Sequence, residues 1–445
     1  MRVAYVTAGG AGMFCGSCMR DNTLAAALLR LGVDVTLIPT FTPIRTDEPD
    51  VSLERVFLGG LNLYLEQWSP WLGRLPRAAR RLLDHPRLLR AISSWSLARR
   101  GAADGAIAVS LLRGEHGKQA ALTDDLVEFV ADSLDPDLVC LTNLLIAGFV
   151  PALKRRAAVP VVVTLQGDDL FLDSLAAGDR EAVLREMRRL AAWIDGFLVF
   201  SRDYRDRMAA LLHVPDERFQ LVPIGLADPT SFARYPRAND PHRPTVGYLA
   251  RICPEKGFEL LVRAFVLLRR QTGMQTARLD FGGWLGRAER PFLAAQWRRL
   301  SDAGAAGAVR RHALPDRDSK ARFLSGLDVF CVPAVYREPK AIFVLEALAA
   351  GVPVVAPAHG CFPELLAATG GGRLVRPNDP VDLARALAEL LGDPERRARL
   401  GREGQRAVAG RFDDEQMARR TLDVWRGLVD RSERAETGAP SSRRG

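Results

Sequence analysis

The chain has 445 residues, of which 48% are hydrophobic and 26% are charged. This is the composition of an ordinary globular protein, and it excludes a disordered chain, a collagen and a coiled coil. Subtracting 53 acidic from 62 basic residues leaves a net charge of +9, which favours anionic ligands or membrane surfaces. A nucleic-acid partner is not expected, because the aromatic residues that such a surface interleaves with its charges are absent.

The sequence predicts a cytoplasmic protein. Its first residues lead from a short apolar run straight into glycines, without the longer apolar core of a secretory signal. No uncharged apolar run reaches the roughly 20 residues that a membrane-spanning helix needs. Six cysteines are too few for a disulfide scaffold, which fits a reducing compartment.

Short buried strands alternate with helices along the first half of the chain. The expected strands are 3–7, 33–38, 138–141, 159–164, 196–200 and 220–223. A helix from about Asp21 to Leu31 joins the first two, which makes a βαβ start. The connector 224–244 carries four prolines and no clear period, so a domain boundary is expected there.

A second alternating series follows this connector. Its expected strands are 245–250, 277–281, 309–312, 329–332 and 353–356, with helices at 257–270, 342–350, 381–391 and, with breaks, 393–428. Such alternation predicts an α/β protein with two doubly wound, Rossmann-like domains. The last residues, 431–445, are rich in Ser, Gly, Pro and charge, and are expected to be a disordered tail.

One segment, Trp71 to Arg100, interrupts the alternation within an expected basic helical insertion at about 70–116. It contains eight arginines and a single acidic residue, Asp84, and its leucines recur near helical spacing. This pattern fits a solvated helical face that covers the first domain. It also fits a surface for peripheral contact with a membrane or an anionic acceptor.

The first strand leads into a loop with glycines at 9, 10, 12 and 16, ahead of a helix. Such a loop lets backbone N–H groups approach a phosphate, although a purely structural tight turn fits equally well. Cys15 and Cys18 flank Gly16, where a helix N-terminus favours the thiolate form. These thiols could shape the loop, act in redox chemistry, or serve as small packing residues.

The second series carries a more specific pattern. Arg251 ends its first strand and Lys256 opens the next helix, which places two cations at the carboxyl edge of a parallel sheet. Both are phosphate-binding side chains. Glu338 precedes an expected buried helix and Glu346 lies within it. A buried Glu346 needs a hydrogen-bond partner, which sugar hydroxyls or a structural arginine would supply.

These motifs together resemble the family 4 glycosyltransferases, which are retaining enzymes of the two-domain GT-B fold. The resemblance covers nearly the whole chain and rests on Arg251-x4-Lys256-Gly257, Glu338-x7-Glu346-Ala347, Gly351-Val-Pro-Val-Val355 and Pro363-Glu364. It implies two Rossmann-like domains facing across a cleft. The implied parts are an acceptor domain at 1–228, a donor domain at 229–410, a terminal helix at 411–430 that returns to the first domain, and the tail at 431–445.

The resemblance implies a hexosyltransferase that moves a sugar from a UDP- or GDP-type nucleotide sugar to an unidentified acceptor. It implies retention of configuration and neither a metal nor another cofactor. Arg251 and Lys256 would bind the donor diphosphate and act in catalysis, together with Glu338, which would face the transferred sugar. Glu346 would take the ribose hydroxyls.

Further donor contacts are implied by the same resemblance. Backbone amides of Ala341, Ile342 and Phe343 would cap the phosphates. Gly16 would approach the diphosphate from the first domain. Gln166 stands where the family often has a histidine facing the donor sugar, and it would supply a hydrogen bond without titrating.

Two other functions remain open at this stage. One is a catalytically silent nucleotide-sugar-binding protein, and the other is a thiol-redox protein that uses Cys15 and Cys18. A metal site is not expected, because the histidines show no zinc-binding spacing. Asp135-Pro-Asp137 is interpreted as ordinary turn chemistry.

Overall fold

The computed structural model describes residues 1–9, 16–58, 103–237, 240 and 242–437. Two compact units make up the chain, unit 1 being Met1–Phe200, Tyr204–Pro223 and Met417–Gly445, and unit 2 being Ser201–Asp203 and Ile224–Gln416. The expected domain boundary after residue 228 lies within a few residues of the Pro223–Ile224 division. Cys15 and the basic segment 71–100 lie outside the described residues.

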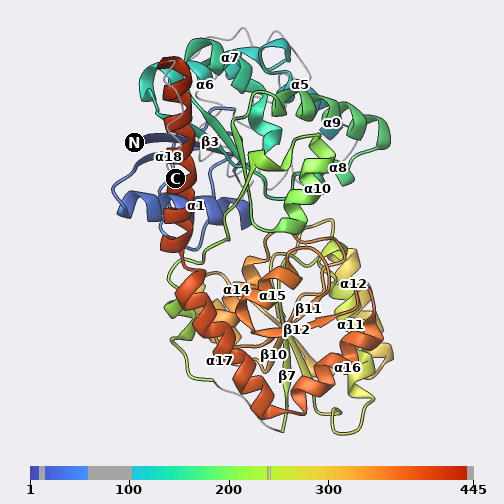
Figure 1. The fold of residues 1–445 in the computed structure, drawn as a ribbon. Helices are drawn as coiled ribbons and strands as arrows, with labels where there is room; N and C mark the ends of the chain where they lie inside the picture. Colours follow the sequence, from blue (N-terminus) through green and yellow to red (C-terminus); the bar gives the residue numbers. More distant parts are fainter. Residues whose placement is uncertain (10–15, 59–102, 238–239, 241, 438–445) are drawn as a thin grey trace. The chain divides into compact units, whose positions relative to one another are not determined.

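Unit 1 is built on a six-stranded parallel sheet with the order β2-β1-β3-β4-β5-β6. Figure 1 labels β3, which belongs to this sheet. Its strands are β1 (Arg2–Thr7), β2 (Asp34–Pro39), β3 (Leu138–Leu141), β4 (Val161–Thr164), β5 (Gly196–Val199) and β6 (Phe219–Leu221). The central strands are fully buried, as in a parallel sheet that helices cover on both faces. The strand order reverses between β1 and β3, and open α/β sheets bind ligands at such switch points.

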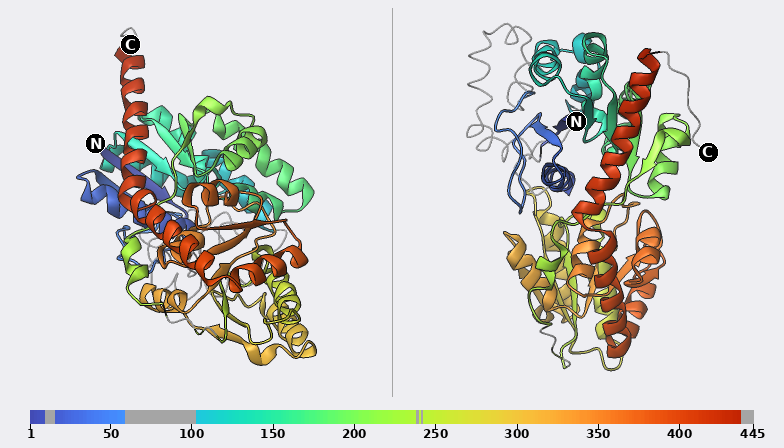
Figure 2. Two further views of the ribbon diagram at one scale, coloured as in Figure 1. Left: turned by 60° about the horizontal axis from the view of Figure 1, so that its bottom comes forward. Right: turned by 60° about the vertical axis from the view of Figure 1, so that its left-hand side comes forward.

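The helices of unit 1 complete its core. They are α1 (Gly16–Arg30), α5 (Ala103–Leu112), α6 (Ala120–Glu128), α7 (Val150–Arg156), α8 (Asp168–Asp173), α9 (Ala177–Ala191), α10 (Arg202–Leu212), whose first two residues belong to unit 2, and α18 (Asp414–Thr437), which belongs to unit 1 from Met417. Although the sequence suggested a basic insertion up to about residue 116, α5 contains no basic residue and packs on α9. Figure 2 shows α18 as one long helix at the end of the chain, and its Trp425 is fully buried against Tyr5.

Unit 2 contains a second six-stranded parallel sheet with the order β12-β11-β10-β7-β8-β9. Its strands are β7 (Thr245–Leu249), β8 (Arg278–Gly282), β9 (Val309–His312), β10 (Val329–Cys331), β11 (Val354–Pro357) and β12 (Gly372–Val375). Renumbered within the unit, this is the 3-2-1-4-5-6 order of a doubly wound sheet, with its switch point between β7 and β10.

Helices pack on both faces of the second sheet. They are α11 (Phe258–Arg269), α12 (Arg290–Asp302), α13 (Arg317–Ser325), α14 (Ile342–Ala349), α15 (Phe362–Thr369), α16 (Pro380–Leu391) and α17 (Pro394–Arg411). Helices α11 and α16 contact each other on one side, and α14 contacts α17 on the other (Figure 1). The predicted pair of doubly wound α/β domains is therefore confirmed.

The structure differs from the prediction at β12 and at the end of the last helix. Strand β12 was not expected, because its sequence follows two glycines and its first three residues are only partly buried or exposed. The last helix continues to Thr437, so residues 431–437 are helical and not part of a disordered tail. This stretch is polar but contains neither Gly nor Pro, so nothing in it interrupts a solvated helix.

Among the described helices, none is both long and apolar enough to cross a membrane.

Candidate functional site

The loops that follow β7 and β10 meet at the switch point of unit 2. Gly257 lies in the left-handed region with φ +72°, and a Cβ atom there would fall 1.8 Å from the carbonyl oxygen of Pro333. Only glycine allows this approach, because any side chain would overlap the β10 loop. The contact places Arg251 and Lys256, which follow β7, beside the residues that follow β10.

Lys256 and Glu338 form a buried ion pair at this point. The Lys256 Nζ atom donates to Glu338 Oε2 at 2.5 Å, and their side chains are 12% and 3% exposed. The ammonium group also lies 5.0 Å from the ring centres of Tyr336 and Phe343. The aromatic faces and the carboxylate together hold one positive charge in a fixed place.

The environment of Glu338 keeps its carboxyl group ionised. Burial by itself would raise its pKa, but the charge and hydrogen bond of Lys256 and the hydroxyl of Tyr336 bring the pKa below its usual value. The Tyr336 hydroxyl donates to Oε2 at 2.6 Å, and the Ala341 N–H lies 3.4 Å from Oε1. A buried, ionised carboxylate thus stands at the carboxyl edge of the sheet.

Helix α14 begins directly after Glu338. Ala341 caps it in the left-handed conformation with φ +52°, which is strained for a residue other than glycine. The amides of Ile342 and Phe343 belong to the first turn, where N–H groups have no intrahelical acceptor and the helix end is partly positive. These features suit the binding of an anionic group.

Glu346 lies one turn further along α14 and is buried. Its Oε1 atom accepts a hydrogen bond from Lys320 Nζ of α13 at 3.0 Å. The structural partner that the sequence suggested was an arginine, and the structure supplies a lysine instead. No local motif around Lys320 indicates this pairing, because it is created by tertiary packing, in which α13 and α14 both contact the segment Pro229–Ala233.

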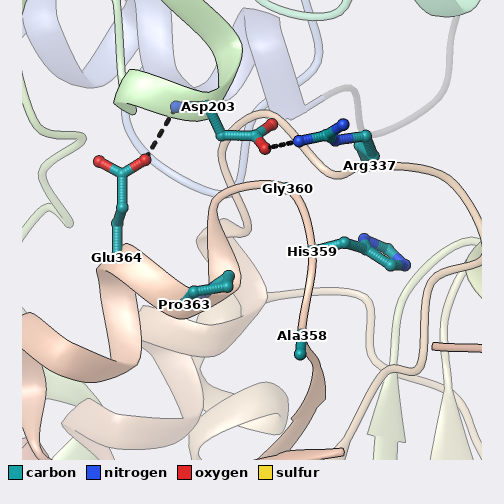
Figure 3. Close-up of a pocket in the computed structure, with 7 residues that line it drawn as sticks. All are labelled: Asp203, Arg337, Ala358, His359, Gly360, Pro363 and Glu364. Atoms are coloured by element: carbon teal, nitrogen blue, oxygen red, sulfur yellow. Dashed lines mark hydrogen bonds and ion pairs between the residues drawn. The ribbon is translucent and has the colours of Figure 1, made fainter. Parts of the chain in front are cut away.

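A cavity of about 580 Å³ opens beyond the end of β11 in unit 2 (Figure 3). It is lined by Asp203, Arg337, Ala358, His359, Gly360, Pro363 and Glu364. Gly360 has φ +60°, and a Cβ atom there would meet the backbone nitrogen and oxygen of Glu338 at 2.5 and 2.7 Å. The Cys361 N–H also donates to the Glu338 carbonyl at 2.8 Å. The cavity wall is therefore fixed to the backbone of Glu338.

In unit 1, Gln166 lies beyond the end of β4 and is buried. Its Nε2 donates to Asp21 Oδ1 at 2.8 Å, to Thr142 Oγ1 at 3.0 Å and to the Thr142 carbonyl at 3.2 Å. Three acceptors around one amide nitrogen fix the orientation of this side chain.

Asp21 of α1 gathers donors from several strands at the switch point of unit 1. It accepts from Tyr5 Oη at 2.6 Å and from Thr7 Oγ1 at 2.9 Å, in addition to Thr142 and Gln166. The neighbouring Arg20 is also fully buried. No motif in the sequence predicts this network, and its only local signal is the run of Arg, Asp and Asn in an otherwise apolar helix.

Gly16 is the first residue of α1, and the loop before it lies outside the described residues. The Cys18 side chain is 2% exposed, which fits the packing role considered for it. Asp137 accepts a hydrogen bond from the Arg2 N–H at 2.7 Å, which fits its interpretation as a turn residue. Within the described ranges, no three His, Cys, Asp or Glu side chains gather in a metal-binding arrangement.

Family models match both units of the chain. Residues 22–225 match a glycosyl transferase 4-like domain, and residues 232–407 match the glycosyl transferases group 1. A GDP-mannose-dependent alpha-(1-6)-phosphatidylinositol monomannoside mannosyltransferase of Mycolicibacterium smegmatis is 31% identical over 275 residues, which is 59% of this chain and 67% of that protein. A D-inositol 3-phosphate glycosyltransferase of Nocardia farcinica is 32% identical over 248 residues, but the chain spans only about half of its length (53% of each chain).

Solved structures resemble the whole chain. Sucrose-phosphate synthase from Thermosynechococcus elongatus has a TM-score of 0.69 at 19% identity, covering 97% of this chain and all of that one. Anabaena HepE, in complex with UDP, has a TM-score of 0.67 at 16% identity, covering 96% of this chain and all of that one. These similarities confirm the predicted GT-B fold. Together with the family models and the mannosyltransferase, they show that the chain belongs to the family 4 glycosyltransferases and is an enzyme of that class.

Proposed function

We propose that this glycosyltransferase moves a hexose from a nucleotide diphosphate sugar, and that unit 2 binds this donor at its switch point. The buried Lys256–Glu338 pair beside the N-terminus of α14 carries the proposal. A GDP- or UDP-type nucleotide is supported by the names of the similar proteins, one of which is GDP-mannose-dependent and another of which was crystallised with UDP.

In the proposed reaction, the site stabilises the leaving nucleotide. Negative charge develops on the diphosphate as the bond to the sugar breaks. Arg251, Lys256 and the first amides of α14 would meet that charge with preorganised positive groups. In this proposal the protein's own cations do the work that a metal does in other transferases. Glu338 would face the sugar, and Glu346 would hold the ribose.

The finer features of the proposal come from the family. Retention of configuration and independence of metal follow the family pattern, as do the donor contacts of Gly16 and Gln166. The acceptor is not assigned, and peripheral membrane contact through 71–100 stays a prediction.

The proposal is tested by incubating the protein with a panel of GDP- and UDP-sugars and measuring release of the nucleotide. We expect one donor to be turned over, with activity unchanged by a metal chelator and with a product anomer that matches the donor. Failure to bind any nucleotide sugar would contradict the donor class. Inversion in the product would contradict retention of configuration alone, and loss of activity with the chelator would contradict independence of metal alone.

A further inference from the structure

The cavity at the end of β11 contains three buried polar atoms that have no hydrogen-bond partner in the protein. They are Nδ1 and Nε2 of His359 and Oδ2 of Asp203. Leaving buried polar atoms unsatisfied costs about 1–3 kcal/mol for each group, so native proteins pair them with protein, water or ligand. Their concentration in one cavity indicates a place that a polar ligand completes.

The other polar groups of the cavity are already engaged. Asp203 Oδ1 pairs with Arg337, and Glu364 accepts the N–H groups of Arg202 and Asp203 at 2.9 Å each. In the view of Figure 3, His359 and Arg337 project on one side of the loop formed by Ala358–Gly360, and Glu364 lies on the other side. The guanidinium of Arg337 is thus offset by a carboxylate, and a second carboxylate stands nearby.

This balance of charge favours a neutral, hydroxyl-bearing ligand over a phosphate. Two carboxylates would repel an anion, and the one arginine among the lining residues is paired. Burial and the positive charge of Arg337 lower the pKa of His359, so its imidazole is neutral near pH 7. A neutral imidazole offers one donor and one acceptor, which is what a sugar hydroxyl needs.

The position of His359 indicates which sugar is concerned. His359 precedes Gly360, whose Cα lies against the backbone of Glu338, and Glu338 is the residue proposed to face the transferred hexose. The imidazole also lies near the backbone of Ala334 in the β10 loop. The ring is therefore held between the loops that follow β10 and β11.

We infer that His359 hydrogen-bonds a hydroxyl of the transferred hexose, with Asp203 as a second acceptor in the same cavity. This inference rests on the proposed function. It supplies an imidazole from unit 2 in a chain that has Gln166 where the family often has its histidine. The contact is to the sugar alone, so it should distinguish a nucleotide sugar from the free nucleotide.

The test compares His359→Phe, His359→Asn and His359→Gln with the wild type by calorimetric titration. The ligands are the sugar nucleotide that the wild type binds, drawn from the GDP- and UDP-sugar panel, and the matching nucleoside diphosphate. For His359→Phe we expect an affinity for the sugar nucleotide about threefold to tenfold lower, the effect of one hydrogen bond, and an unchanged affinity for the diphosphate. One of the two amide variants should restore most of the loss, because an amide can replace one ring nitrogen. His242→Phe, in an exposed loop of the same unit, is the control.

Several results would overturn the inference. If His359→Phe bound the sugar nucleotide as tightly as the wild type, His359 would not contact the sugar. An equal loss of affinity for the sugar nucleotide and the nucleoside diphosphate would indicate a structural role. A rise only in the KM for acceptor would assign the cavity to the acceptor. In these cases the wild type still binds its donor, so the proposed function stands. If the wild type bound no member of the panel, the proposed function would fail and the inference with it.

Discussion

At the scale of single residues, the ammonium group of Lys256 is the best-defined charge of the proposed donor site. It lies between one carboxylate and two aromatic rings, so it needs little reorganisation to meet a diphosphate. Lys256→Ala and Arg251→Ala should each lower kcat/KM. The loss should correspond to roughly 2–4 kcal/mol of transition-state stabilisation, the effect of losing one preorganised donor. Steady-state kinetics measure this loss, and Arg263→Ala on the exposed side of α11 is the control. Near-wild-type kcat/KM in either variant would refute its placement at the diphosphate.

Glu338 and Glu346 should respond differently to loss of charge. Glu338 neutralises Lys256 in the donor-free protein, so Glu338→Gln should leave the affinity for nucleoside diphosphate unchanged or raise it a few-fold while kcat falls. Glu346→Gln should mainly weaken nucleotide binding, because its proposed partner is the ribose. Titration calorimetry and kinetics on both variants separate these effects. Weaker nucleotide binding only in Glu338→Gln would reverse the two assignments.

Asp168 gives the first unit a dependence on pH. Burial raises its pKa to about 6, even though it accepts the N–H groups of Leu144 and Gln166 at 2.7 and 3.1 Å. Because the folded state binds this proton more tightly than the unfolded state, the contribution of Asp168 to stability is largest below about pH 4. That contribution declines as the pH rises to about 6 and is constant above it.

The comparison of wild type with Asp168→Asn tests this effect. The stability difference, wild type minus variant, should fall by on the order of 2–3 kcal/mol between about pH 4 and 6.5, since one pKa unit corresponds to about 1.4 kcal/mol. Melting temperatures measured across this range check the trend. A difference that grows with pH would show that Asp168 is ionised in the folded protein throughout.

At the scale of the elements, Gly257 joins the start of α11 to the loop after β10. Gly257→Ala should cost more than the roughly 1–2 kcal/mol of a left-handed alanine, because its Cβ must also displace Pro333. Gly273→Ala is a matched control, with φ +80° and no atom within 4 Å of the added Cβ. Chemical denaturation measures the stability of each variant. Nucleotide titration measures the affinity for nucleotide, which should fall if the substitution displaces Lys256. Equal effects of the two substitutions would show that the contact between the loops is not needed.

At the scale of the whole molecule, the last helix is a structural part of unit 1. Trp425 is fully buried and meets Tyr5 edge-on, with ring centres 6.4 Å apart. Trp425→Ala should destabilise unit 1 by about 3–5 kcal/mol. Nucleotide binding by unit 2 should be retained. Trp193→Ala, at a residue 39% exposed in the same unit, should have little effect. Unfolding curves recorded with and without nucleotide measure the stability of unit 1 and nucleotide binding by unit 2. If Trp425→Ala weakened both in parallel, α18 would not be a part of unit 1 alone.

The alternation of strands and helices made the fold predictable, because buried parallel strands are short apolar runs that stand out in a sequence. Arg251, Lys256, Glu338 and Glu346 could be proposed because they keep fixed spacings around one strand and one helix. The partners of these residues could not be foreseen. Lys320 is joined to Glu346 by the packing of α13, which no local pattern encodes.

The same limit explains what was missed elsewhere. The donors around Asp21 come from residues as distant along the chain as Thr142 and Gln166, so only the sheet order brings them together. His359 seemed an ordinary loop residue in the sequence, because the cavity beside it depends on how the loops after β10 and β11 lie. Strand β12 was missed for a local reason, since its edge position gives it little of the apolar character used to find strands.

The return of α18 to unit 1 has a consequence for biosynthesis. All six strands of unit 1 precede residue 224, and residues 224–416 then emerge from the ribosome before Trp425 does. Domains generally fold as they are synthesised, so unit 2 can complete its sheet while translation is still in progress. Unit 1 lacks one of its core residues until the whole of unit 2 has been synthesised. During this interval the face of Tyr5 that Trp425 covers in the finished protein has no partner from α18.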